Sequence, residues 1–183
     1  MKAAWRRALL LVAPLIAGAC VVAAQPDGAA GAATPVVPLA VAAKVGYGQA
    51  TPPQAKRLWS VCVDSVNTAR AAAGSGPVQM DARAWVAAAD QSTYQAQTQK
   101  MSHVGSDGSN GGARLIGAGY IWSTWGENIG AGQADCQTVV ADWLTSASHR
   151  ANLLNPAFRH IGIGMAIGAN GVPYWTMDLA AGG

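Results

Sequence analysis

The end of the chain alternates apolar side chains with small residues in two short runs. Between the runs lies Asn170-Gly171, and Asn-Gly flanked by alternating apolar residues is the strongest short-range signal of a β-hairpin. The chain therefore has to place two antiparallel strands side by side near its C-terminus. The alternating residues are Ile161, Ile163, Met165 and Ile167 in the first run, and Trp175, Met177 and Leu179 in the second.

Helices are predicted ahead of this hairpin. Apolar residues at helical spacing predict one helix over residues 53–73 and a second that follows Asp81 and runs to about Lys100. A third helix begins after Asp135, which like Asp81 is a favourable N-cap residue. A strand is predicted through residues 127–129. Helices that precede late antiparallel strands favour a layered α+β fold over a parallel βαβ fold.

The first 24 residues have the pattern of an export signal. Positive charges at Lys2, Arg6 and Arg7 precede an apolar run over residues 8–16, and the small residues at 22–24 suit cleavage directly after them. The apolar run is short and interrupted, which disfavours a membrane span. We therefore expect a secreted protein, with residues 1–24 as a signal peptide.

The alternative to soluble secretion is a lipid anchor at Cys20. Residues 17–20 form a degenerate lipobox that lacks the usual leucine three positions before the cysteine. The following stretch, 25–51, is rich in alanine and proline, shows no helical or strand period, and is predicted to be a flexible tether. Residues 52–183 are then the one folded domain.

The formal charge of +3 does not indicate a nucleic-acid partner. Lys2, Arg6 and Arg7 lie in the predicted export signal, and without these three the twelve basic residues fall to nine, which equals the nine acidic residues. No basic cluster follows Arg7. The electrostatic footprint of a nucleic-acid-binding surface is therefore missing.

Cysteine usage favours a disulfide. If Cys20 is removed or lipidated, Cys62 and Cys136 remain, and an even pair in an exported chain is typically oxidised. That bond would close a loop of about 75 residues, worth roughly 2–4.5 kcal/mol in the chain-entropy model. The alternative is a pair of buried thiols.

Glu127 is the only glutamate of a chain that contains eight aspartates. It lies in WGENIGAG at 125–132, while His103 lies in a glycine-rich loop over residues 101–112 and His149 in a short helical turn. Two imidazoles and one carboxylate make an open zinc site or a proton-handling site if the fold brings them together. The alternative is structural: Glu127 accepts hydrogen bonds from one or both histidines and fixes how the loops dock.

A series of short motifs follows one another over residues 58–179. In this order and spacing they resemble the CAP superfamily, the domain of cysteine-rich secretory proteins, antigen 5 and pathogenesis-related proteins, also called the SCP domain. The resemblance is strongest to its bacterial secreted branch and implies a three-layer α-β-α sandwich with a central antiparallel sheet. The motifs are Asn67-Thr68-Ala69-Arg70, Ser102-His103, Gly126-Glu127-Asn128-Ile129, Trp143 with the segment from Ser146 to Leu154, Ile161-Gly162-Ile163-Gly164, and Tyr174-Trp175.

The resemblance also implies a site. In that superfamily a cleft gathers two histidines and two acidic residues, in some members around a divalent cation. Matched by motif, His103 and His149 are the two histidines and Glu127 is one of the acids, so these three are the candidate metal ligands, with zinc as the cation, and the candidate catalytic residues. The second acid would stand three positions after Trp143, where this chain has Ser146. That departure weakens the expectation of metal binding.

Three functions stay open at this point. The favoured one is a secreted, non-enzymatic binding module whose cleft, or a groove beside it, holds a small apolar ligand or an envelope component. The resemblance implies lipids as a ligand class, because some relatives bind sterols or fatty acids. The alternatives are a metal-dependent extracellular hydrolase and a host- or cell-interaction protein with a purely structural cleft. A serine hydrolase is disfavoured, because neither Ser146 nor Ser148 lies in a G-x-S-x-G elbow.

Overall fold

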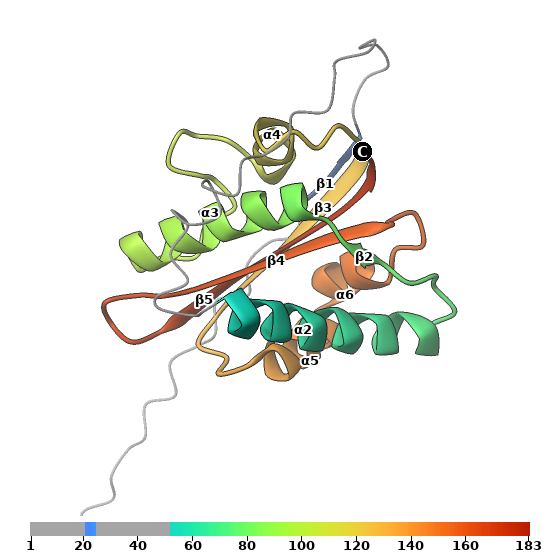
Figure 1. Ribbon diagram of the computed structural model, residues 1–183, viewed down its shortest axis with the longest axis horizontal. Helices are drawn as coiled ribbons and strands as arrows, with labels where there is room; N and C mark the ends of the chain where they lie inside the picture. The colour runs from blue at the N-terminus through green and yellow to red at the C-terminus, as the bar shows by residue number, and fades with distance from the viewer. Residues whose placement is uncertain (1–20, 25–51) are drawn as a thin grey trace, which may run out of the picture.

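The computed structural model describes residues 21–24 and 52–183 (Figure 1). The rest of the predicted export signal and the predicted tether at 25–51 lie outside the described residues. Within the two described ranges, no helix combines the length and apolarity that a bilayer crossing requires. The elements are β1 (Val21–Ala24), α2 (Pro52–Ala72), β2 (Gln79–Met80), α3 (Ala82–Thr98), α4 (Gly111–Gly117), β3 (Trp122–Ala131), α5 (Cys136–Thr145), α6 (Ala147–Leu154), β4 (His160–Ile167) and β5 (Pro173–Gly182).

The predicted hairpin is present and forms the centre of the sheet. Its strands β4 and β5 pair antiparallel, and β3 pairs antiparallel with the other edge of β5. The sheet order is β1-β3-β5-β4-β2. The predicted central antiparallel sheet is thus correct for β3, β5 and β4, but β2 runs parallel to β4 and makes the whole sheet mixed. A strand of two residues carries no readable alternation, so the sequence holds no signal for β2.

β1 lies inside the predicted export signal. It pairs antiparallel with β3, from Val21 opposite Glu127 to Ala24 opposite Thr124. Within residues 52–183, the domain therefore consists of five helices around four strands, and β1 adds a fifth strand along the outer edge of β3.

Helices cover both faces of the sheet. In Figure 1, α3 and α4 lie on one face, and α2, α5 and α6 lie on the other. The main helices begin where the sequence predicts, because the side chain of Asp81 caps α3 and that of Asp135 caps α5. The predicted α+β fold with three layers, helix on sheet on helix, is confirmed.

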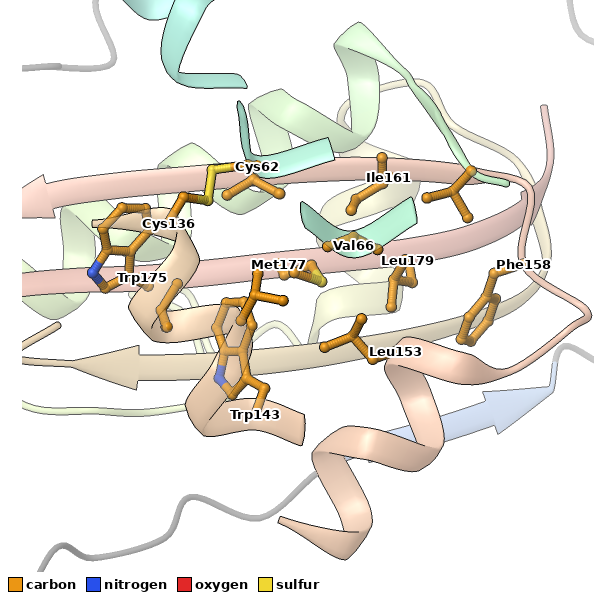
Figure 2. Close-up of a cluster of buried hydrophobic side chains, with 14 residues drawn as sticks. Cys62, Val66, Cys136, Trp143, Leu153, Phe158, Ile161, Trp175, Met177 and Leu179 are labelled. Carbon is orange, nitrogen blue, oxygen red and sulfur yellow. A yellow bond between two sulfur atoms is a disulfide. The ribbon is translucent and has the colours of Figure 1, made fainter. Parts of the chain in front are cut away.

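The larger apolar core lies between the sheet and α2, α5 and α6 (Figure 2). β5 sends Trp175, Met177 and Leu179 to this face, as its alternation predicts. The disulfide between Cys62 of α2 and Cys136 of α5 lies at one end of the core, with its Cα atoms 5.3 Å apart. The predicted disulfide is therefore present, and it links two helices that are far apart in the sequence.

On its opposite face, β4 packs closely against the backbone of α3. Gly162 and Gly164 lie directly beneath the backbone of α3, and a Cβ atom at Gly164 would lie 2.5 Å from the carbonyl oxygen of Ala88. Small residues on both elements, including Ala84, let the helix backbone rest on the strand. The glycines of the predicted strand are thus explained by packing.

We expect Gly164→Ala to lower the free energy of unfolding by about 1–3 kcal/mol, because the new methyl group overlaps the α3 backbone. Urea unfolding followed by tryptophan fluorescence measures this loss. Gly76→Ala is the matched control, since a Cβ there meets nothing within 4 Å. Equal effects of the two substitutions would contradict the packing role of Gly164.

Candidate functional site

Glu127 lies in the middle of β3, where neighbouring residues point to opposite faces of the sheet. Its carboxylate faces α4 and the loop before it, and its side chain is only 1% exposed. The next residue, Asn128, points toward α6. A carboxylate buried this deeply needs partners that meet its charge.

Two side chains from the α4 side meet that charge. His103 places Nδ1 2.6 Å from Glu127 Oε1, and Arg114 forms an ion pair with Oε2. Arg114 also donates to the backbone carbonyls of His103, at 3.2 Å, and of Ser109, at 2.9 Å. The predicted proximity of His103 and Glu127 is present, and Arg114 ties both to the loop.

Asp178 is a further member of this cluster. It stands opposite Glu127 in the β3–β5 register, on the same face of the sheet, and is fully buried. Burial, and next the charge of Glu127, raise the pKa of Asp178 well above the usual range, although Arg114 opposes this. The Asp178 carboxyl is therefore harder to ionise than a free aspartic acid. Neither of its carboxyl oxygens has a hydrogen-bond partner among the described residues.

Neither Asp178 nor Arg114 is among the residues that the sequence motifs single out. A signal for Asp178 exists, because in β5 it alternates with the apolar Met177 and Leu179 and so lies on the opposite face of a strand that is covered on both sides. Arg114 lies in α4, and nothing in the sequence of that stretch points to Glu127. Only the packing of α4 on β3 brings the two together.

His149 is not part of the cluster. It lies on α6, and its backbone carbonyl accepts a hydrogen bond of 3.0 Å from Asn128, on the other face of β3 from the Glu127 carboxylate. Its side chain lines a separate cleft of about 700 Å³ beside residues 129–131. Ser146, the residue that the resemblance matches to the second acid, lines the same cleft. The three predicted site residues are therefore divided between two places.

This arrangement does not fit a resident cation. Glu127 already contacts His103 through one oxygen, and its other oxygen pairs with a guanidinium that would repel a metal ion. His149 lies on the other side of the strand, and the Asp142 carboxylate accepts a hydrogen bond from Gln133 at 3.0 Å. In residues 21–24 and 52–183, no group of three or more His, Cys, Asp or Glu side chains is placed to hold a metal. The zinc site expected at His103, Glu127 and His149 is not assembled.

Comparison with known proteins agrees with the fold and the motifs. The model of the CAP family, described as the cysteine-rich secretory protein family, matches residues 63–179. The chain belongs to the CAP family. Over 46 residues it is 50% identical to the uncharacterized protein YkwD of Bacillus subtilis (strain 168), a stretch that covers 25% of this chain and 18% of that protein.

Solved structures show the same CAP fold. An outer surface protein of Borrelia burgdorferi superposes with a TM-score of 0.64 at 16% identity, over 70% of this chain and 95% of that one. An extracellular SCP-domain protein of Bacillus anthracis gives 0.60 at 24% identity, over 73% and 44% of the two chains. A cysteine-rich secretory protein of Staphylococcus aureus gives 0.54 at 20%, over 74% and 40%. This CAP chain thus spans less than half of the last two proteins.

The raised pKa of Asp178 predicts a pH dependence of stability. Because its pKa is raised in the folded state, the folded protein keeps a proton that the unfolded chain loses above its ordinary pKa of 3.8. The free energy of unfolding therefore falls as pH rises from that value toward the raised pKa, by at most about 1.4 kcal/mol per pH unit for one proton. Asp178→Asn removes the titrating group at nearly unchanged size and therefore removes this dependence.

Urea unfolding of both proteins between pH 4 and 8 measures the effect. We expect the stability of Asp178→Asn relative to the wild type to increase steadily with pH. Asp64→Asn, at an exposed position of α2, is the control for loss of one carboxylate. A pH-independent difference between Asp178→Asn and the wild type would show that folding does not raise the pKa of Asp178.

Proposed function

We propose that this CAP-family chain is an exported, non-enzymatic binding module that holds a small apolar ligand in the cleft beside residues 129–131. The observation that carries the proposal is the character of that cleft. Its volume of about 700 Å³ is within the usual range of small-molecule sites, roughly 300–1,000 Å³. Apolar and aromatic side chains form a large part of its lining, namely Met101, Ile129, Ala131, Trp143 and Tyr174.

Polar side chains complete the lining, namely Gln99, Lys100, Gln133, Asp142, Thr145, Ser146 and His149. A cavity that combines apolar walls with placed polar groups suits a ligand with an apolar body and a polar end. Two structurally similar proteins support export, because one is described as extracellular and the other as an outer surface protein.

The geometry favours binding over hydrolysis. A hydrolase needs a nucleophile or water held by a base that a third group orients. Here Glu127 is engaged by Arg114 and His103. The hydroxyls of Ser146 and Ser148 face each other at 3.3 Å, and this contact gives neither of them a base. The cluster of His103, Glu127 and Arg114 therefore compensates the buried charge of Glu127 and does not activate a nucleophile.

Binding is tested with anilinonaphthalene sulfonate, whose fluorescence rises in apolar surroundings. We expect saturable binding by the wild type and binding that is about tenfold weaker, or about 1.4 kcal/mol, in Met101→Gln, because one apolar wall of the cleft becomes polar. Competition by a fatty acid and by a sterol then reports which class of apolar ligand enters.

Val104→Gln is the matched control. Val104 is also apolar, is 53% exposed and does not line the cleft, so this change removes surface apolarity elsewhere. Equal weakening in the two variants would place the dye on the general surface. Unchanged affinity in Met101→Gln would contradict the cleft as the binding site.

A further inference from the structure

The strand β1 covers the outer edge of β3. Its residues, 21–24, pair antiparallel with residues 124–127, and β1 is the terminal strand in the sheet order. Figure 1 shows β1 alongside β3. Strands pair at a sheet edge through backbone N–H and C=O groups. This stretch of β3 therefore accepts one extended segment at its outer edge.

Features on both sides of residues 124–127 limit the length of that edge. Toward the start of β3, the register with β5 shifts between Trp122 and Thr124, and such irregularities interrupt strand pairing. Toward the end of β3, the carbonyl of Ile129 already accepts a hydrogen bond of 2.8 Å from the indole of Trp143. The edge is therefore suited to a short strand, of the length of β1.

The sequence of this edge contains few of the features that protect edge strands. Residues 124–127 include neither lysine nor proline, which natural edge strands use against unwanted pairing. The one charged residue among them, Glu127, is paired with Arg114 on the α4 side of the sheet. Its charge is thereby compensated inside the domain and does not oppose an uncharged strand.

The strand β1 belongs to the predicted export signal. Cleavage directly after Ala24 removes residues 21–24 from the exported protein and takes away the strand that pairs with residues 124–127. Open strand edges pair readily with other chains. A second copy of this chain is a poor occupant, because α4 and α6 both pack on β3 and two copies would bring these helices together at the shared edge. A single extended segment carries no such layers.

We propose that the β3 edge of the exported protein docks an extended peptide segment of a partner protein, which takes the place of β1. Main-chain hydrogen bonds supply the affinity in this mode of recognition. The segment that lies there in the structure, Val21-Val22-Ala23-Ala24, shows which chemistry fits: it is short, uncharged and free of proline. The docking edge does not include residues 129–131, which border the apolar cleft.

A fluorescein-labelled peptide with the sequence of residues 21–25 tests this proposal by fluorescence anisotropy. The protein is purified after export, N-terminal sequencing shows whether it begins at Gln25, and its unfolding midpoint verifies the fold. We expect saturable binding to this form. Binding to the unprocessed full chain should be about tenfold weaker or less, because its own β1 occupies the edge.

Two N-methylated peptides provide a matched control. In an antiparallel pair, alternate residues direct their N–H groups at the neighbouring strand. One peptide is methylated on the nitrogens that correspond to residues 21 and 23, and the other on those that correspond to residues 22 and 24. The two have the same side chains and the same number of methyl groups. We expect one of them to bind like the parent peptide and the other to lose at least about tenfold in affinity.

Several results would overturn the docking edge. They are the absence of saturable binding, equal affinities of the two methylated peptides, equal binding by the exported and full-length forms, and an exported protein that still carries residues 21–24. A dimer of the exported protein that excludes the peptide would assign the edge to a second copy instead. Met101→Gln alters the apolar cleft and should leave peptide affinity unchanged, so failure of one proposal does not imply failure of the other.

Discussion

Burial of the Glu127 carboxylate between a sheet and a helix layer is costly unless its charge is met on several sides. Two elements meet it: the loop through the imidazole of His103 and α4 through the guanidinium of Arg114. The Asp178 carboxyl of β5 lies opposite Glu127 on the same face, and burial raises its pKa well above the usual range. Removing Arg114 would leave a buried negative charge beside a second carboxyl group, so the position of α4 and of its loop depends on this ion pair.

This cluster also determines what each face of the sheet can do. The face toward α2, α5 and α6 holds the apolar core and the disulfide, which joins the distant helices α2 and α5. The face toward α3 and α4 holds Glu127, Asp178 and Arg114. Arg114 reaches from Glu127 to the backbone of Ser109, in the loop that lines a cleft of about 330 Å³ beside α3. Charge compensation and the shape of that cleft thus share one side chain.

The sequence predicts those parts of the fold that local patterns specify. The hairpin follows from Asn170-Gly171 between alternating strands, and two helix starts follow from the capping side chains of Asp81 and Asp135. The disulfide between Cys62 and Cys136 follows from parity and export. These features need no knowledge of how the layers meet.

The candidate site is different, because it depends on which face of β3 each layer covers. The sequence singles out Glu127 by its uniqueness, and the structural alternative of a histidine hydrogen-bonded to it matches the contact with His103. It does not show that α6 docks on the opposite face, which removes His149 from the set. Asp178 is one polar residue in an apolar run, and its importance appears only when the β3–β5 register places it opposite Glu127.

The tripeptide Gly126-Glu127-Asn128 joins the three layers. A Cβ atom at Gly126 would lie 2.9 Å from the side chain of Asn152, so the glycine leaves room for α6 to approach. Asn152 then donates to the carbonyl of Glu127, at 3.1 Å, and to the side chain of Asn128, at 3.1 Å. Glu127 itself turns to the other face and meets α4. Because successive residues of a strand point to opposite faces, three neighbours bind both helix layers to the sheet. The same segment therefore contacts Arg114 of α4 through Glu127 and the backbone of His149 on α6 through Asn128.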